Sequence, residues 1–394
     1  MICKSSLVSL VVLWSSLFCG AALAEDSAGS IPEEKLTTLA VQLPATSIEI
    51  GGTRLALAAG EYHYNLYLPK GYNDDPQRQF PVLFKMSSVG DAKMEGFEAR
   101  LKRDKIIFIG LVEAKNGEWP PILANFIAAH DDAMKRFRIA EGFRFATGAS
   151  GGARASSCFT YLRPGFAGLL FQAAGTGIAG LEAFTRTPTL CAFATFGYTD
   201  SNTNEAAQIA GGLPAYTPRR IITFNGGHTG APEAEMNEAF DFMETWAYTR
   251  SPAVEKRKPM YVQRFKDLME LAAGAEGMKK YEFLEAAQAH AKARRLSEDK
   301  NLAGDVTIVS MTLKDLAKDE KIVKELAARK AYSDAREIED THWYTLVKPD
   351  ASFRNFLRQA GKKYETIGTQ FSGTLYGDKA AERGKWMTAI PDAK

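Results

Sequence analysis

A serine set between glycines is the residue in this sequence best placed to do chemistry. Ser150 stands in Gly-Ala-Ser-Gly-Gly, residues 148–152, which matches the pattern G-x-S-x-G. A serine hydroxyl becomes a nucleophile only when a neighbouring base accepts its proton. Between a strand and a helix, this pattern projects the serine from a sharp turn where a carbonyl group can reach it. Alone the pentapeptide is a weak signal, because it occurs by chance in about one chain in ten of this length.

Two later segments supply the groups that a nucleophilic serine needs. The segment "ATFGYTDSNTN" carries Asp200 after a strand-like run, and "ITFNGGHTG" carries His228 after another. An imidazole can accept the serine proton and return it to the leaving group, while a carboxylate fixes the imidazole tautomer. We therefore predict Ser150 as nucleophile, His228 as base and Asp200 as the orienting acid. Glu205 and Asp241 are alternatives for the acid, since aspartate after a strand is also a common turn or N-cap residue.

Strand-like and helix-like segments alternate from about residue 46 to residue 250, which predicts an α/β fold with a mainly parallel sheet. The strand-like runs are short and apolar on both faces, as expected where helices cover both sides. They include "FPVLFKM", "FRFATG", "GLLFQAAG", "CAFATFGYTD" and "RRIITFNGG". Helices are expected at 92–102, 121–138, 151–162, 203–211 and 232–249. The serine, aspartate and histidine each follow the carboxyl end of an expected strand, where open α/β sheets bind ligands.

Three segments together carry a resemblance to a known family. They are "YNLYLPKGYNDDPQRQFPVLF", "GASGGARASSCFTYLRPGFAGLLFQAAG" and "FNGGHTGAPEAEMNEAFDFM". Residues 45–250 resemble secreted α/β-hydrolase esterases, nearest to the feruloyl esterase and polyhydroxybutyrate depolymerase branch. The resemblance implies an α/β-hydrolase sheet flanked by helices, and a serine ester hydrolase that works through an acyl-enzyme without a cofactor. The order serine, aspartate, histidine along the chain is also the order of this fold.

One loop departs from the family pattern. Such enzymes usually carry a His-Gly loop after the third strand, where this chain has "FKMSSVGDAK". The backbone N–H of Gly151 is expected to be the first oxyanion-hole donor, and that of Met86 or Ser87 the second. A missing donor would cost about 3–4 kcal/mol of transition-state stabilisation. The departure therefore favours a second hypothesis beside the esterase, an impaired scaffold that binds a partner. A serine peptidase on the same fold is a third hypothesis.

Other residues have both a functional and a structural interpretation. Trp119 follows a strand and either lines the substrate pocket or anchors its loop. Cys158 and Cys191 form a disulfide if the protein is exported, or are two buried thiols. His130 with the following Asp131 and Asp132 lacks a second ligand pair at helical spacing, so we expect a solvated helix face and no metal site.

The two ends of the chain differ from its middle. Lys4, the apolar run "LVSLVVLW" and "AALAED" predict a signal peptide over residues 1–24, cleaved after Ala24, and hence a secreted or periplasmic protein. The run is too short for a membrane span. Residues 251–394 hold 27 Lys+Arg and 22 Asp+Glu, which predicts a separate helical domain with charged faces, and a partner protein could bind there.

The overall charge and length limit the partners further. The net charge of +2 over 394 residues argues against a nucleic-acid surface, which would need a clustered basic excess. Because of the resemblance to esterases, the expected partner is an ester substrate, either a small molecule or a polymer.

Overall fold

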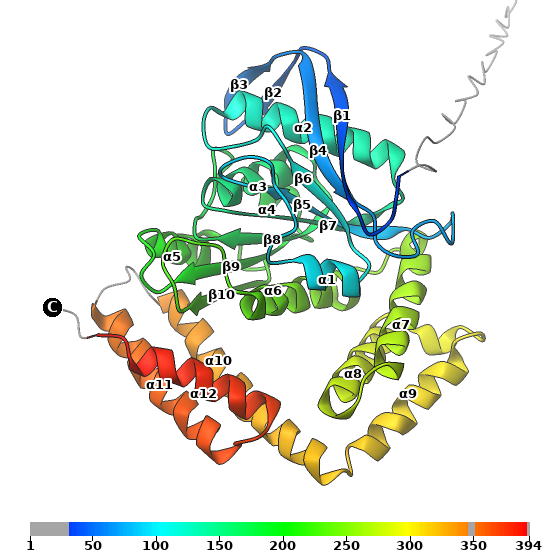
Figure 1. Ribbon diagram of the computed structural model, residues 1–394, viewed down its shortest axis with the longest axis vertical. Coiled ribbons are helices and arrows are strands. Elements are labelled where there is room, and N and C mark those ends of the chain that lie inside the picture. The colour runs from blue at the N-terminus through cyan, green and yellow to red at the C-terminus, as the bar shows by residue number, and fades with distance from the viewer. Residues whose placement is uncertain (1–30, 346–350, 392–394) are drawn as a thin grey trace, which may run out of the picture.

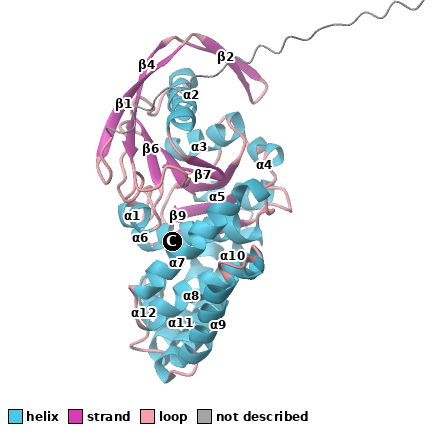
Figure 2. Ribbon diagram, turned by 90° about the vertical axis from the view of Figure 1, so that its right-hand side faces the viewer, coloured by secondary structure: helices cyan, strands magenta, loops and turns pink. Residues whose placement is uncertain are grey.

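The structure, a computed structural model, describes residues 31–345 and 351–391 (Figure 1). The predicted signal peptide and its cleavage site lie outside these residues. Within the described residues, no helix has both the length and the apolar character that a bilayer span requires. A twisted sheet with its covering helices forms one part of the molecule, and helices from the last third of the chain form the other (Figures 1 and 2).

An eight-stranded sheet forms the centre of the fold. Its strands are β1 (Leu36–Leu43), β4 (Gly60–Tyr67), β5 (Phe80–Met86), β6 (Ile107–Leu111), β7 (Ile139–Ala149), β8 (Phe166–Gln172), β9 (Cys191–Gly197) and β10 (Arg219–Phe224). Across the sheet they follow the order β1-β4-β6-β5-β7-β8-β9-β10. Strand β4 is antiparallel to both of its neighbours, and the strands from β6 to β10 are parallel. This topology is the α/β-hydrolase fold that the sequence predicts.

Helices bury both faces of this sheet, which explains why its strands are apolar on both sides. In β5, Val82 and Phe84 belong to the core on one face, while Leu83 belongs to the core on the other. The helices before residue 250 are α1 (Glu98–Arg103), α2 (Trp119–Arg136), α3 (Gly151–Leu162), α4 (Glu182–Arg186), α5 (Thr203–Gly212) and α6 (Glu233–Thr245). Helices α2 and α3 cover the first face, and α1 and α6 cover the second.

A small hairpin and the first strand precede the parallel part of the sheet. Strands β2 (Thr46–Ile50) and β3 (Thr53–Leu57) form a separate two-stranded sheet. Gly51 and Gly52 connect them with φ angles of 55° and 72°, a conformation that favours glycine. Because β1 pairs with β4 along its whole length, the sheet begins at Leu36, before the expected domain start at residue 45.

The chain after residue 250 is helical, as predicted. Its helices are α7 (Lys258–Ala273), α8 (Gly277–Ala293), α9 (Ala303–Leu316), α10 (Glu320–Thr345), α11 (Ala351–Gln370) and α12 (Leu375–Thr388). Among the described residues, the apolar side chains of α7 to α9 join the core that contains α1 and α6, and those of α10 to α12 join the opposite core. The helical region is therefore an extension of the sheet's two cores.

Candidate active site

Ser150 lies in a strained turn between β7 and α3. Its φ of 55° and ψ of −120° are unusual for a residue with a side chain, and such conformations cost about 1–3 kcal/mol and cluster at functional sites. The flanking glycines are required by the space available. A Cβ on Gly148 would lie 2.5 Å from the carbonyl oxygen of Met86, and a Cβ on Gly152 would lie 2.4 Å from the same atom. The close packing of β5 against this turn therefore excludes side chains on both sides of Ser150.

His228 lies between the serine and the predicted aspartate. Its Nε2 is 2.9 Å from the Ser150 Oγ, and its Nδ1 is 2.9 Å from the Asp200 Oδ1. The Asp200 side chain is fully buried, whereas that of His228 is 43% exposed. When Nδ1 donates its proton to the carboxylate, Nε2 is left as an acceptor facing the serine hydroxyl. The structure thus brings the three predicted residues into one hydrogen-bonded chain.

The loops that carry Asp200 and His228 are bonded to each other. The N–H groups of Tyr198 and Thr199 donate to the carbonyl oxygens of Phe224 at 3.0 Å and Gly226 at 3.1 Å. The Thr199 hydroxyl also donates to Gly226, at 2.9 Å. These bonds hold the segment after β9 against the segment after β10, so the carboxylate and the imidazole keep a fixed separation.

The two alternative acids have other partners. Glu205 accepts a hydrogen bond from the Gly175 N–H at 2.6 Å and pairs with Arg154. Asp241 lies on α6 and pairs with Arg100 at 2.6 Å. Among the three candidate carboxylates, Asp200 is therefore the one that contacts the imidazole.

Gln172 connects the serine turn with the histidine loop. Its carbonyl oxygen accepts from the Ser150 N–H at 2.9 Å, and its Nε2 donates to the Thr147 hydroxyl at 2.9 Å. Its Oε1 accepts from the Ala231 N–H at 3.2 Å, beyond His228 in the same loop. The sequence analysis did not single out this residue, although its position as the last residue of a strand beside the serine turn was a usable signal.

The residues predicted as oxyanion donors lie in the serine turn and in the strand end and loop beside it, and their role as donors stays a prediction. Gly151 begins α3, and the first N–H groups of a helix have no acceptor within it. Met86 ends β5 beside the serine turn, opposite Gly148 in the parallel ladder. Ser87 follows, and its carbonyl accepts from the Gly90 N–H at 3.2 Å to close a turn.

Asn116 is a second polar residue at the site that the sequence analysis missed. Its Oδ1 is 1.7 Å from the position that a Cβ on Gly151 would occupy, so its amide lies directly against the residue after the serine. Its N–H donates to the Ser88 carbonyl at 2.9 Å, which ties the loop after β6 to the loop after β5. The sequence did contain a signal for Asn116. It lies in a polar loop shortly after β6, which ends at the same edge of the sheet as β5 and β7.

Trp119 begins α2 and is half-buried. A Cβ on Gly177 would lie 2.7 Å from its Cη2 and 2.8 Å from the Cys158 sulfur, so the ring packs near α3 and the loop after β8. These contacts are those expected if Trp119 anchors its own loop, the structural interpretation given above. A role in a substrate pocket stays a prediction.

Of the two alternatives for Cys158 and Cys191, the structure shows two buried thiols and no disulfide. Cys158 belongs to the core on one face of the sheet, and Cys191 to the core on the other. Burial raises the pKa of Cys158 to about 11 and also raises the pKa of Cys191, so both thiols stay protonated at neutral pH.

The expectation of a solvated face around His130 is wrong. His130 is only 4% exposed, and its Nε2 lies 2.7 Å from the Arg144 Nη1. Its Nδ1 lies 2.8 Å from Asp131, and burial lowers its pKa. No three His, Cys, Asp or Glu side chains in the described ranges cluster as ligands of a metal ion would.

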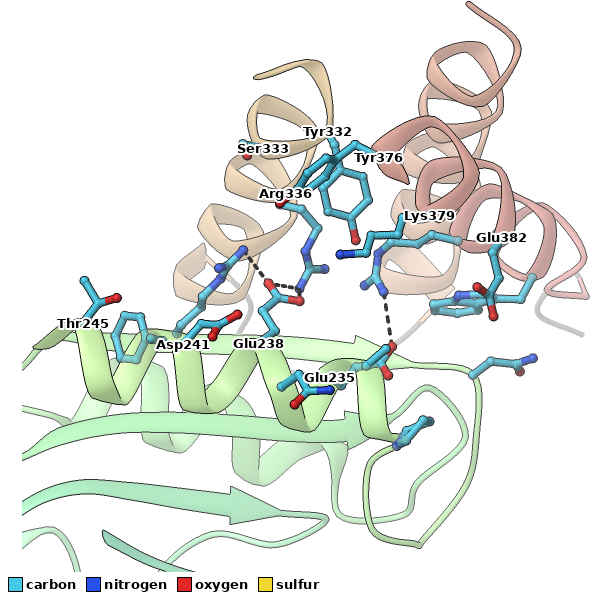
Figure 3. Close-up of a pocket in the computed structure, with 18 of the residues that line it drawn as sticks. Glu235, Glu238, Asp241, Thr245, Tyr332, Ser333, Arg336, Tyr376, Lys379 and Glu382 are labelled. Atoms are coloured by element: carbon cyan, nitrogen blue, oxygen red, sulfur yellow. Dashed lines mark hydrogen bonds and ion pairs between the residues drawn. The ribbon is translucent and has the colours of Figure 1, made fainter. Parts of the chain in front are cut away.

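A large cavity lies elsewhere, between α6, α10 and α12 (Figure 3). It measures about 1140 Å³, and its lining includes Glu235 and Glu238 of α6, Arg336 of α10 and Lys379 of α12. Ser150, Asp200 and His228 are not among the lining residues. This cavity is therefore separate from the candidate site.

No protein-family model and no curated protein matches the sequence. Solved structures that are similar in fold include a ferulic acid esterase, at 11% identity and a TM-score of 0.39, covering 54% of this chain and 99% of that one. An IroE-like serine hydrolase from Shewanella oneidensis has 11% identity and a TM-score of 0.40, covering 72% and 99%. The carboxylesterase EstE1, cloned from a metagenomic library, has 10% identity and a TM-score of 0.35, covering 56% and 91%. Similarities this distant carry no argument about function, which depends on the site itself.

Proposed function

We propose that the protein is a serine hydrolase that cleaves carboxylic esters through an acyl-enzyme. The observation that carries the proposal is the chain of two 2.9 Å contacts from the Ser150 Oγ through His228 to Asp200. Two further observations support the proposal. The backbone of Ser150 is strained, and the packing at Gly148 and Gly152 leaves no space for any side chain.

The reaction follows from this geometry. His228 Nε2 accepts the hydroxyl proton as the Ser150 oxygen bonds to the ester carbon, and the carbonyl electrons move onto its oxygen. The N–H groups of Gly151 and of Met86 or Ser87 stabilise that oxyanion. The alcohol leaves with the proton from His228. Water then attacks the acyl-enzyme with His228 again as base, which releases the acid and restores the serine.

Asp200 stabilises the imidazolium that forms in each step. Its Oδ2 is buried and has no hydrogen-bond partner among the described residues. A buried, incompletely bonded carboxylate gains most from a positive neighbour. The Asp200 carboxylate therefore stabilises the imidazolium that forms when His228 accepts the serine proton.

A panel of p-nitrophenyl esters tests the proposal, with wild type compared against Ser150→Ala. Loss of a triad serine removes on the order of a million-fold in kcat. Ser201→Ala is a matched control, since Ser201 is exposed and lies near Asp200. A fluorophosphonate probe should label wild type and the control at Ser150. Equal rates for wild type and Ser150→Ala would favour a binding scaffold, and faster cleavage of peptides than of esters would indicate a peptidase.

We further propose that the enzyme is exported and acts on esters like those of the feruloyl esterase and depolymerase branch. The support is the N-terminal Lys4, apolar run and Ala-Leu-Ala, together with the resemblance of residues 45–250. Mass spectrometry of the protein expressed with its native N-terminus should show cleavage after Ala24. Comparing turnover of methyl ferulate with that of hydroxybutyrate oligomers separates the two substrate classes.

A further inference from the structure

The helical extension touches the loop that carries Asp200. The Trp386 ring of α12 stacks on the Tyr198 ring, with centroids 5.7 Å apart and planes inclined by 28°. Tyr198 directly follows β9, two residues before Asp200. An aromatic pair of this kind fixes both the distance and the orientation of its partners. Helix α12 therefore contacts the backbone segment that places the acid.

The same helix touches the strand that leads to His228. Arg383 Nη2 donates to the Thr223 carbonyl oxygen at 2.8 Å. Strand β10 is the last strand of the sheet and pairs only with β9. Its outer edge would otherwise expose unpaired backbone groups. Arg383 thus holds the free edge of β10 one residue before that strand ends.

A buried charge cluster fixes Arg383. Glu339 of α10 accepts from the Arg383 Nε at 3.0 Å and from the Arg336 Nη1 at 2.7 Å. Burial alone would raise the pKa of Glu339, but the two guanidinium groups outweigh it and lower that pKa to about 2. The carboxylate is therefore ionised, and it holds Arg383 in one orientation.

The extension also holds the helix that follows His228. Arg336 pairs with Glu238 at 3.1 Å, and Arg383 lies 3.9 Å from Glu235 (Figure 3). Both glutamates stand in the first two turns of α6, which begins a few residues after His228. The histidine loop is thus held at its β10 end and at its α6 end by the same two helices.

We propose that α10 and α12 position the Asp200–His228 pair relative to Ser150, with Trp386 and Arg383 as positioning residues. This inference rests on the proposed hydrolase function. Ser150 is held inside the sheet by β5 and Gln172, whereas the other two residues follow the last two strands at its edge. Misplacement of a catalytic group by about 1 Å costs on the order of 10²-fold in rate. The extension adds its restraint to the bonds that Gln172 and the neighbouring loops already make.

Full-length Trp386→Ala and Trp386→Phe test the inference with the p-nitrophenyl ester that wild type cleaves best. Trp386→Ala should lower kcat by about 10- to 100-fold with KM nearly unchanged, and Trp386→Phe should recover most of that loss.

A matched control lies on the same helix. Tyr376→Phe removes a 2.6 Å hydrogen bond to Glu282 of α8 without touching either catalytic loop. It should keep the wild-type kcat and KM. Circular dichroism and thermal unfolding confirm that each variant is folded.

Tyr198→Ala removes the same stack from the other side and covers the case in which Trp386→Ala does not fold. Its loss of kcat should match that of Trp386→Ala, and the double variant should be no worse than either single one. A folded Trp386→Ala or Tyr198→Ala with the wild-type kcat would overturn the inference. The proposed function would stand in that case, provided that activity still depends on Ser150. Activity that does not depend on Ser150 would instead overturn the proposed function.

Discussion

Replacing Gly148 by alanine tests whether close packing behind the serine turn sets the geometry of the site. The new Cβ would lie 2.5 Å from the Met86 carbonyl oxygen, 2.5 Å from the Gly152 carbonyl carbon and 2.7 Å from the Gly152 Cα. All three are backbone atoms, so no side chain can rotate away. Real Cβ contacts are essentially never shorter than 3.0 Å. The end of β5 and the start of α3 must therefore each move away from residue 148 by roughly 0.5 Å.

The expected cost has two parts. Overpacking of this kind lowers the free energy of unfolding by about 1–3 kcal/mol. Moving the start of α3 also moves the Ser150 Oγ and the Gly151 N–H away from His228 and from the second oxyanion donor. A shift approaching 1 Å lowers kcat by on the order of 10²-fold. A 10²-fold loss corresponds to about 2.7 kcal/mol in activation free energy, so we expect the losses in kcat and in the stability of the fold to be of similar size.

Ester turnover and urea unfolding measure the two parts separately. Gly211→Ala is the matched control, because a Cβ there would meet no atom within 4 Å. Gly211 lies in α5, where alanine is favoured over glycine by about 0.5–1 kcal/mol. The control should be slightly more stable than wild type, with unchanged kcat. Wild-type kcat in Gly148→Ala would refute the packing argument.

Three further changes have defined outcomes. Burial raises the pKa of Asp340 to about 6, so stability present with the protonated carboxyl is lost as the pH rises through that value. Asp340→Asn removes this pH dependence together with the 2.6 Å pair to Arg220, so the free energy of unfolding of the variant relative to wild type should rise by about 1–2 kcal/mol between pH 4 and pH 8, by urea titration. Asn116→Ala should lower kcat about tenfold, because its amide lies against Gly151 and its removal lets the predicted first oxyanion donor move by a fraction of the 1 Å that costs about 10²-fold, with exposed Asn301→Ala as the kinetic control. Dithiothreitol should leave the Tm unchanged, because Cys158 and Cys191 are free.

The sequence predicts most of the sheet because its signals are local. Apolar runs bounded by glycine and polar residues mark β5 to β10, and the helix at 151–162 matches α3. The position of Ser150, Asp200 and His228 after β7, β9 and β10 then brings them to one sheet edge, since parallel strands end together. Strand β1 was missed, because Leu36–Leu43 alternates half-buried with exposed residues and lacks the apolar character of the central strands.

Other features depend on contacts that no local pattern encodes. Strand β9 is buried on both faces, so the sequence does not tell which face Cys191 joins. His130 looks like part of a solvated charged stretch until Arg144, from a later strand, pairs with its ring. Gln172 and Asn116 act through backbone and amide contacts to other loops, which become visible only when those loops are placed.

The charges of the extension show the same difficulty and also explain how it docks. Arg336, Glu339 and Arg383 are almost fully buried, although their sequence resembles a solvated face. A buried ion pair adds little net stability, because desolvation offsets the attraction, but breaking one costs about 3–5 kcal/mol. A shift of α12 by one turn along α10 would leave a guanidinium without its carboxylate. The cluster therefore selects one register, and in that register Trp386 reaches Tyr198 and Arg383 reaches the edge of β10.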